Sequence, residues 1–464
     1  MLNQTLQEKY PHLEISVLKL SEVQKDNESK RIDSEFFKKE YFDAMETMQL
    51  NQVEYLGDNM KFNSRYSQPK YDETSKIKVI NSQYIRNEYI DYENAKSGYG
   101  KIVPKESVLI NATGVGTLGR VFINILDFDF SIDSHINVIV VKNKTYLNPY
   151  FLAIFLQSYY GQIQIIRYYS GTSGQIEIYP RDFNYFKIPI FPMEFQLEIQ
   201  NLVKDSHKAL EESKELYKKA EETLYLELGL DPKNPLQSLL DSKTNNPTNS
   251  PNISIHTLKE SFLKTGRLDS EYYQSKYEDI EKFIKSYPNG YDSFSSIINN
   301  KDTNFTPKNN ENYSYIELAN IGNNGNISEP ISDLGKNLPT RARRIVSKGD
   351  VIISSIEGSL SSCALITQEF DKHLVSTGFF VLNSKLLNGE TLLVMFKSQI
   401  FQEYLKKFPS GTILCAINKE ELSKILIPKI DSTTQEKIAK YIQESFNLRK
   451  KSKQLLDNAK IKVE

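Results

Sequence analysis

The chain contains no tryptophan, only two cysteines and only five histidines. Cys363 and Cys415 are isolated, which argues against a disulfide framework or a cysteine zinc cluster, and we expect both to be small buried apolar residues. The histidines are scattered, so they indicate neither a set of metal ligands nor a nucleophile–base pair. These absences argue against a metal centre and against nucleophilic catalysis.

The sequence also lacks an excess of one charge and a long apolar run. The formal net charge is -1, so any nucleic-acid binding has to come from local basic patches. No window approaches ~18 apolar residues, and the N-terminus has no charged region followed by an apolar one. We therefore expect a soluble, cytoplasmic protein.

What the sequence does contain is an internal repeat. Tyr168-Tyr169-Ser170-Gly171-Thr172 precedes a β-like segment that ends near Ile190 and a long helical stretch around Gln196. Phe408-Pro409-Ser410-Gly411-Thr412 opens the same series near the C-terminus, with Gln435 in the matching place. With 464 residues available, this period predicts two copies of one architecture.

A second repeated motif lies near the start of each copy. Arg31-Ile32-Asp33-Ser34-Glu35 matches Arg267-Leu268-Asp269-Ser270-Glu271, and two aromatic residues follow in both cases. The serine is a candidate helix N-cap. We interpret the Arg–Asp pair as a local structural clamp.

The two C-terminal helical stretches share one heptad register, with small residues at matched heights. One expected core stripe contains Ile199, Ser206, Ser213 and Ala220, and the other contains Leu202, Ala209, Leu216 and Thr223. The second helix carries Ile438, Ser445, Ser452 and Ala459 in the same positions. Small residues allow close approach along such a seam. Direction cannot be read from the register, so parallel and antiparallel pairing both stay open.

Three short motifs suggest catalysis but lack the required context. Gly114-Val115-Gly116-Thr117-Leu118-Gly119 has the spacing of a cofactor loop, but a strand-like run follows, so we predict a glycine-rich hairpin. Asn148-Pro149-Tyr150-Phe151 lacks the second proline of the amino-methyltransferase signature, and we predict a helix start. The Glu-x-Lys at Glu28 has no convincing preceding aspartate. The sequence therefore favours a binding protein.

Basic residues in the dissimilar middles of the two copies are the candidates for binding. Arginine can read guanine bidentately or hold a phosphate. The first-copy candidates for DNA contact are Arg65, Lys70, Arg86, Arg120, Arg167, Tyr168, Tyr169, Gly171 and Thr172. The second-copy candidates are Arg341, Arg343, Arg344, Lys348, Lys406, Lys407, Gly411 and Thr412. No catalytic or metal-binding residue is predicted.

The doubled series of motifs resembles the DNA specificity subunit of Type I restriction-modification systems. The residues that carry the resemblance are Ser170-Gly171-Thr172, Ile188-Pro189-Ile190, Pro192 and Gln196-x-x-Ile199, repeated as Ser410-Gly411-Thr412, Ile427-Pro428 and Gln435-x-x-Ile438. The resemblance covers nearly the whole chain. It departs from the family around Ile430-Asp431 and Thr433-Thr434, where a proline-rich approach to the glutamine is usual.

The resemblance implies an α+β fold with two tandem target recognition domains, each followed by a long helix, and the two helices paired as an antiparallel coiled coil. The expected parts are a first recognition domain (1–190), a spacer helix (191–228), a linker (229–252), a second recognition domain (253–430) and a second spacer helix (431–464).

The resemblance further implies a non-catalytic subunit that reads a bipartite DNA target. Its partners are double-stranded DNA, methyltransferase subunits and, in some complexes, a restriction or translocase subunit. It needs no cofactor of its own, because S-adenosylmethionine is expected on the methyltransferase. Two alternatives stay open: a self-contained DNA methyltransferase or nuclease, and a protein-interaction scaffold that uses the paired helices without touching DNA.

Overall fold

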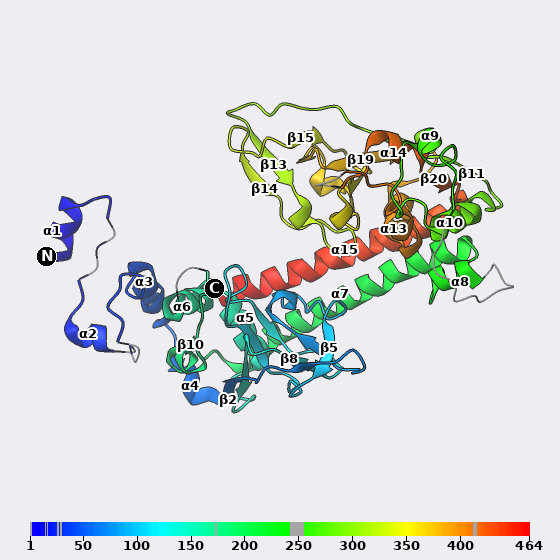
Figure 1. The fold of residues 1–464 in the computed structure, drawn as a ribbon. Coiled ribbons are helices and arrows are strands. Elements are labelled where there is room, and N and C mark those ends of the chain that lie inside the picture. The colour runs from blue at the N-terminus through cyan, green and yellow to red at the C-terminus, as the bar shows by residue number, and fades with distance from the viewer. Residues whose placement is uncertain are drawn as a thin grey trace. The chain divides into compact units, whose positions relative to one another are not determined.

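The computed structural model describes residues 2–13, 15, 17–25, 27, 30–171, 174–241, 255–411 and 415–464. Two compact units make up the chain (Figure 1). Unit 1 contains residues 1–210 and 450–464, and unit 2 contains residues 211–449. Each unit therefore takes one part of each long helix, α7 (Met193–Glu227) and α15 (Ser432–Val463).

Unit 1 is built on two four-stranded sheets and one short two-stranded sheet. The first sheet has the order β2-β9-β6-β7 and the second the order β3-β5-β4-β8, while β1 pairs with β10. The strands are β1 (Val53–Tyr55), β2 (Met60–Arg65), β3 (Lys70–Tyr71), β4 (Lys78–Ile80), β5 (Lys96–Tyr99), β6 (Val108–Asn111), β7 (Val121–Ile123), β8 (Phe130–Ile132), β9 (Ile136–Val141) and β10 (Lys187–Pro189).

Unit 2 repeats this plan. Its sheets have the orders β12-β19-β16-β17 and β14-β13-β18-β15, and β11 pairs with β20. The strands are β11 (Tyr291–Ser293), β12 (Ile298–Asn300), β13 (Asn312–Ile316), β14 (Ile331–Leu334), β15 (Ala342–Ile345), β16 (Val351–Ser354), β17 (Cys363–Leu365), β18 (Leu374–Ser376), β19 (Phe379–Ser384) and β20 (Leu426–Pro428).

The first sheets of the two units match strand for strand, whereas the second sheets differ at their edges. Both second sheets contain a parallel pair, β4 with β8 and β13 with β18. Unit 1 adds β3 beyond β5, while unit 2 adds β15 beside β18. The place of β15 is taken in unit 1 by a single bridge between Ile102 and Ser131. The structural divergence is therefore concentrated in the second sheet.

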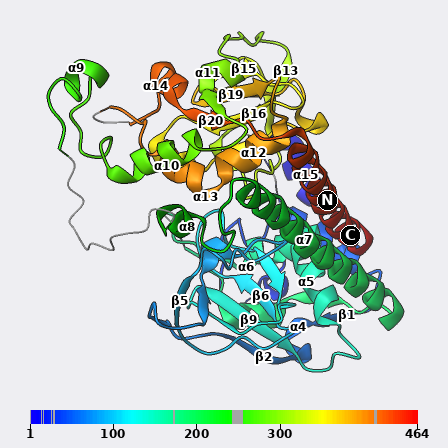
Figure 2. The ribbon, with the colours of Figure 1, turned by 90° about the vertical axis from the view of Figure 1, so that its right-hand side faces the viewer.

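Helices cover the first sheet in both units. In unit 1, α5 (Pro149–Gln157) packs against β6 and β7 and is followed by α6 (Tyr159–Tyr168) (Figure 2). In unit 2, α12 (Gly389–Lys397) packs against β16 and β17 and is followed by α13 (Gln399–Leu405). The Asn148 side chain caps α5 by accepting from the backbone N–H of Tyr150 at 2.9 Å, with Pro149 in the first turn, so the predicted helix start is confirmed.

The remaining helices are shorter and lie before or between these elements. They are α1 (Leu2–Lys9), α2 (Leu20–Gln24), α3 (Lys39–Met48), α4 (Leu56–Asn59), α8 (Pro235–Asp241), α9 (Phe262–Thr265), α10 (Ser275–Lys285), α11 (Phe294–Ile297) and α14 (Lys419–Lys424), with 3-10 turns η1 (Ser82–Tyr84), η2 (Pro180–Tyr185), η3 (Leu318–Asn320), η4 (Glu357–Ser359) and η5 (Gln368–Phe370). Helix α8 lies in the predicted linker (229–252), of which residues 242–252 lie outside the described residues.

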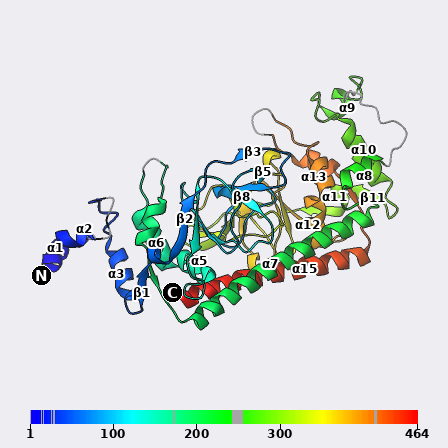
Figure 3. The ribbon, with the colours of Figure 1, turned by 90° about the horizontal axis from the view of Figure 1, so that it is seen from below.

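The long helices α7 and α15 run side by side in opposite directions (Figures 1 and 3). In unit 1 the Ser206 and Ser452 hydroxyls lie 2.9 Å apart, and Lys462 pairs with Glu198 at 2.8 Å. In unit 2 the Ser213 and Ser445 hydroxyls lie 3.0 Å apart. The predicted α+β class with two repeated domains and antiparallel paired helices is confirmed.

The predicted heptad is half right. All eight members of the stripe that begins at Ile199 and Ile438 are buried, as expected. The second buried stripe on α7 is Val203, Leu210, Tyr217 and Leu224, whereas Leu202, Leu216 and Thr223 of the predicted stripe are only half-buried. The shift arises because these residues pack into the hydrophobic cores of the two units as well as along the helix seam.

A carboxylate caps the start of α15. The Asp431 carboxylate accepts from the Thr434 N–H at 3.0 Å, which also lowers the pKa of Asp431 through hydrogen bonds to Thr434. An N-terminal carboxylate suits the positive end of the helix. The cap is therefore Asp431, the residue directly before the first residue of α15, Ser432.

The repeated Arg–Asp motif is a clamp in both units. Arg31 forms an ion pair with Asp33 at 2.7 Å and donates to the Tyr169 carbonyl at 2.7 Å. Arg267 pairs with Asp269 at 2.7 Å and donates to the Pro409 carbonyl at 2.8 Å. Each arginine thereby fixes the chain just before a Ser-Gly-Thr motif. The predicted serine cap is wrong, because the aspartate before the serine accepts the backbone N–H. Asp33 accepts the N–H of Phe36, and Asp269 accepts that of Tyr272.

Candidate nucleic-acid interface

Several connections of unit 1 meet at one end of its first sheet. Strands β2 and β6 end there at Arg65 and Asn111, while β7 and β9 begin there at Val121 and Ile136, because these strands pair antiparallel. We call the connections at this end the loop edge of unit 1: residues 66–69, 81–89, 112–120, 133–135, 170–171 and 174–177, with 172 and 173 outside the described residues. Loops displayed by a rigid sheet are suited to binding.

The Ser-Gly-Thr segment is part of this loop edge. Glu177 forms backbone bridges with both Thr113 and Ser170, which ties the glycine-rich hairpin to the Ser-Gly-Thr segment. Gly171 has φ +114°, and a Cβ there would lie 2.1 Å from the Gln175 carbonyl oxygen. Glycine is therefore required at Gly171 by backbone geometry.

Unit 2 has an equivalent loop edge with different side chains. Its connections are residues 301–304, 317–327, 355–362, 377–378 and 410–417, of which 412–414 lie outside the described residues. Ala416 bridges both Ile356 and Ser410, matching the bridges of Glu177. Gly411 has φ +134°, in the same place as Gly171. The frame is repeated, while the side chains it presents are not.

The glycine-rich run of unit 1 is a hairpin, as predicted. Strand β6 pairs antiparallel with β7 across Gly114–Gly119, and no helix follows to hold a pyrophosphate. Val115, at the tip, is 67% exposed. The run is therefore a displayed loop.

Arg65 holds the loop edge of unit 1 together. Its guanidinium forms an ion pair with Glu177, donates to the Ile178 carbonyl and lies 5.8 Å from the centre of the Tyr179 ring. Lys70, by contrast, is exposed on the outer strand β3.

Arg86 and Arg120 come together from different loops. Both donate to the Ile85 carbonyl, at 3.1 Å and 3.3 Å, and Arg120 also donates to the Gly116 carbonyl at 2.7 Å. Burial, followed by the positive charge of Arg86, lowers the pKa of Arg120. The fold thus concentrates two positive charges beside the glycine-rich hairpin.

The structure removes Arg167 and Tyr168 from the candidate surface. Arg167 is 4% exposed, and its guanidinium lies 3.8 Å from the centre of the Tyr41 ring and 4.2 Å from that of Phe36. Tyr168 is buried and stacks on Phe186 at 5.6 Å. Tyr169 is half-buried beneath the Arg31 clamp. Arg167 and Tyr168 face the core because they lie on the buried side of the last turn of α6.

In unit 2 the arginine cluster divides between surface and interior. Arg341, in the turn that precedes β15, and Arg343, on β15, are both exposed. The Thr377 N–H donates to the Arg341 carbonyl at 2.9 Å, which places Arg341 at the loop edge of unit 2. Arg344 is half-buried, donates to the Phe379 carbonyl, and has its pKa lowered by burial.

The lysine candidates of unit 2 do not join that edge. Lys348 is exposed in the turn between β15 and β16, at the opposite end of the sheet, where its N–H donates to Asp371 at 2.9 Å. The Lys407 side chain is only 12% exposed and forms an ion pair with Glu281, so it is a structural cation. Lys406 is exposed and pairs with Glu403 at 2.7 Å. Thr172 and Thr412 lie outside the described residues.

Acidic residues at the loop edge were not predicted. Glu177 pairs with Arg65, and Asp133 is a buried carboxyl that accepts the His135 N–H at 2.9 Å. Burial raises the pKa of Asp133. The sequence prediction of the interface rested on positive charge and therefore did not include them. The only available signal was that both residues lie close to turns between β-like runs.

The cysteine prediction holds for one residue. Cys363 is free and buried, and burial raises its pKa to about 12. Cys415 is half-exposed, and its thiol donates to the Gly411 carbonyl at 3.2 Å.

Within the described ranges, no group of three or more His, Cys, Asp or Glu residues could hold a metal ion. No helix in the part of the chain that the structure describes is long and apolar enough to cross a membrane.

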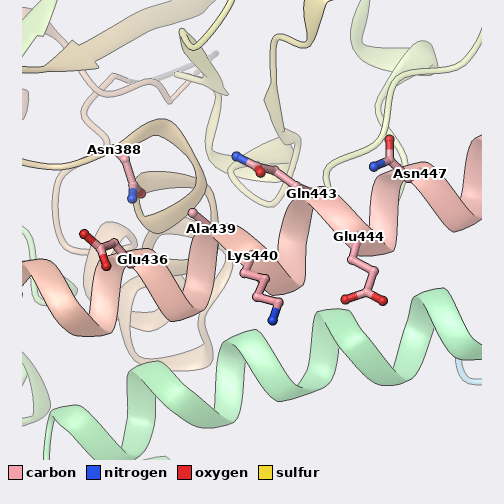
Figure 4. Close-up of a pocket in the computed structure, with 7 residues that line it drawn as sticks. All are labelled: Asn388, Glu436, Ala439, Lys440, Gln443, Glu444 and Asn447. Atoms are coloured by element: carbon pink, nitrogen blue, oxygen red, sulfur yellow. The ribbon is translucent and has the colours of Figure 1, made fainter.

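A polar groove follows α15 within unit 2. Gln443 and Asn447 point to one side of the helix, while Lys440 and Glu444 extend toward α7 (Figure 4). The groove is lined by Asn388, Glu436, Ala439, Lys440, Gln443, Glu444 and Asn447. It is an open surface on which polar and charged side chains lie beside exposed apolar side-chain carbons.

Parts of the chain are similar in sequence to known proteins. Residues 43–222 match the family model described as Type I restriction modification DNA specificity domain. Residues 43–222 are therefore similar to a DNA specificity domain, and the resemblance of the chain to specificity subunits of Type I restriction-modification systems is confirmed.

A curated relative is the Type I restriction enzyme HindI specificity subunit of Haemophilus influenzae, which is 29% identical over 129 residues. That match covers 27% of this chain and 28% of the relative. The S subunit of a Type-I restriction-modification system from M. genitalium matches 89% of this chain and 95% of its own at 14% identity, with a TM-score of 0.43. The HsdS subunit from Thermoanaerobacter tengcongensis has the same coverage and identity, with a TM-score of 0.26.

Proposed function

We propose that this chain is the non-catalytic DNA recognition subunit of a Type I restriction-modification complex. Each unit reads one half of a bipartite target. The observation that carries the proposal is the repeat of one backbone frame that presents different side chains at the same end of the sheet. A DNA target with two different half-sites requires two recognition domains that share a backbone fold and differ in the side chains that face the DNA.

The DNA-facing residues are proposed from the exposed part of each loop edge and the strand beside it. Direct readout needs side chains that reach base edges in the major groove, while phosphate contacts fix position. In unit 1 we propose Arg86, Arg120, Lys70, Gly171 and Thr172. In unit 2 we propose Arg341, Arg343, Gly411 and Thr412. Arg65 and Arg344 support these loops through the backbone, and Lys406 lies beside the Ser-Gly-Thr segment of unit 2.

The partners are proposed to bind along the paired helices. The groove along α15 is lined by Lys440, Gln443 and Glu444, whose polar side chains suit a protein contact. Methyltransferase subunits would bring S-adenosylmethionine and the catalytic residues. A restriction or translocase subunit could join the same complex, and the setting would be the cytoplasm.

The test is a map of modified bases in host DNA with and without this chain. The expected result is methylation at two unrelated half-sites separated by a fixed gap, present only with the chain. A single continuous site would contradict the proposal. Methylation by the purified chain alone would contradict its non-catalytic role, and salt-insensitive or absent DNA binding would favour a scaffold.

A segment exchange sharpens the test. Replacing residues 60–141, which contain the two large sheets of unit 1, with the same segment of a relative should change one half-site and leave the other intact. The matched control is the exchange of residues 298–384 in unit 2. Changes in both half-sites from one exchange would show that the units do not read independently.

A further inference from the structure

In the described part of unit 1, the positive charges of the cluster formed by Arg86 and Arg120 are not balanced by an ion pair with a carboxylate. Two guanidinium groups share the Ile85 carbonyl oxygen as an acceptor, at 3.1 Å and 3.3 Å. Within the described part of the chain, neither arginine forms an ion pair with a carboxylate. The negative charge of Glu88 raises the pKa of Arg120, but by less than burial and the charge of Arg86 lower it. Arg86 also donates to the Gln83 carbonyl. Carbonyl oxygens carry only partial negative charges, so these acceptors cannot balance two cations. The cluster therefore favours an anion.

The backbone around the cluster leaves room for a ligand. Gly116, whose carbonyl holds Arg120 at 2.7 Å, has φ +79°, and a Cβ at this position would meet nothing within 4 Å. The hairpin tip at Val115 is exposed. Both arginines are half-buried, which fixes their side chains while leaving donors at the surface. A guanidinium carries five N–H donors, so each arginine keeps donors after its backbone contacts.

The hydrogen bonds of Arg120 favour contact with phosphate over reading of a base. Bidentate reading of guanine uses two N–H groups along one edge of the guanidinium. Arg120 commits Nη1 to Ile85 and Nη2 to Gly116, so both terminal nitrogens are already tied to the protein. Its remaining donors and its charge can still hold a phosphate oxygen, because phosphate contact tolerates many geometries.

Unit 2 lacks the pair although it repeats the surrounding frame. The bridge between Ile85 and Ile90 matches the bridge between Ile321 and Ile327, which places Gly322 where unit 1 has Arg86. The Asn111 N–H donates to the Arg120 carbonyl at 2.9 Å, and the Ser354 N–H donates to that of Ser362 at 2.9 Å. Ser362 therefore stands at the position of Arg120, and neither counterpart is charged.

We propose that Arg86 and Arg120 together bind one phosphodiester of the DNA backbone, and that this phosphate seat exists in unit 1 alone. The inference rests on the proposed function. It assigns the pair to positioning of the DNA and leaves sequence reading to other side chains of the loop edge. The two half-sites would then be held by unequal electrostatic contributions.

The experiment measures DNA affinity of the full chain against salt concentration, using a duplex that contains the target and one that does not. The R86Q/R120Q variant should lower the steepness of log affinity against log salt by about one, the value for one phosphate contact. Affinity should fall by the same factor on both duplexes, so that their ratio is kept. R86K/R120K, which keeps both charges, should retain the steepness, and equal melting temperatures would show that the variants fold.

A matched control removes the same charge elsewhere in unit 1. K105Q/K144Q deletes two exposed lysines, which pair with Asp127 and Glu106 at the opposite end of the first sheet. An R86Q/R120Q variant with the salt dependence of this control would overturn the phosphate seat. So would loss of discrimination at one base pair with unchanged salt dependence, because that identifies base reading. If the unmodified chain and its complex bind no DNA, the proposed function itself fails.

Discussion

The two units enclose a positively charged side chain at equivalent positions of the repeated fold but stabilise the charge differently. In unit 1 the cation is Arg167, enclosed by the rings of Phe36, Tyr41 and neighbouring aromatics. In unit 2 it is Lys407, which pairs with Glu281 and lies 5.0 Å from the centre of the Tyr272 ring. Each cation lies three residues before the serine of a Ser-Gly-Thr motif.

The difference follows from the chemistry of the two side chains. A planar guanidinium is weakly hydrated and stacks on aromatic faces, whereas an ammonium is a strongly hydrated point charge. The position that supplies Glu281 on α10 is occupied by Met45 on α3 when the two motifs are aligned. Both units therefore keep a positive charge at this position of the repeated fold, but aromatic rings surround it in unit 1 and a carboxylate pairs with it in unit 2.

The largest expected effect comes from breaking this match in unit 1. R167K should destabilise unit 1 by about 3 kcal/mol, because the ammonium would be buried without a carboxylate. Hydrogen exchange of peptides from α5, α6 and β10 measures the loss locally, with peptides of unit 2 as the internal reference.

The comparison also supplies the rescue. Adding M45E to R167K recreates the lysine–carboxylate arrangement of unit 2 and should recover part of the lost protection. K407R in unit 2 keeps its carboxylate partner and should cost less than R167K. An R167K variant as stable as the natural chain would refute the distinction between the two cation sites.

An intermediate effect is expected where the units agree. Gln196 accepts the Asn148 N–H at 2.7 Å and donates to the carbonyls of Tyr146 and Phe191. Gln435 accepts the Asn388 N–H at 2.9 Å and donates to those of Leu386 and Ile430. Each glutamine thus joins the start of a long helix to the start of the helix that covers the sheet.

Q196A and Q435A should each cost about 2 kcal/mol, because each leaves buried backbone groups without partners. Urea unfolding followed by unit-specific exchange measures both losses. The asparagine variants, which keep the amide on a shorter side chain, serve as controls. A large loss in only one unit would show that the shared frame is not energetically equivalent.

These contacts show how far sequence reasoning reached. It located the repeated glutamine, the Arg–Asp clamp and the serine stripe, because such patterns are visible along the chain. It misplaced Arg167 and Lys407 on a DNA surface, because the rings and carboxylate that bury them lie more than 120 residues earlier in the sequence. It chose the wrong second heptad stripe because each helix also packs into a unit core.

The candidate interface was predicted in part for the same reason. Arg86 and Arg120 are 34 residues apart, and no local pattern indicates that both reach the Ile85 carbonyl. The acids Glu177 and Asp133 were missed because their partners are set by strand pairing. Among the arginines proposed to face DNA, only Arg341 and Arg343 could be recognised from a run of adjacent charges in the sequence.

The smallest effect is expected at the caps of α6 and α13. The Tyr225 hydroxyl accepts the Gln399 N–H at 2.8 Å and donates to Glu221 at 2.8 Å. In unit 1 the corresponding acceptor is the Glu464 carboxylate, which accepts the Tyr159 N–H at 2.7 Å. Y225F should cost about 1 kcal/mol, because Tyr225 is buried and its loss leaves a helix N–H unpaired.

E464A should cost less than half as much as Y225F, since the exposed carboxylate can be replaced by water. Its effect should shrink as salt is added, because it depends on the attraction between a charge and a helix N-terminus. The Tyr225 effect should not change with salt. Thermal melts of Y225F, E464A and E464Q in low and high salt separate the two cases. Equal salt dependence for Y225F and E464A would mean that the two units use the same kind of cap despite their different side chains.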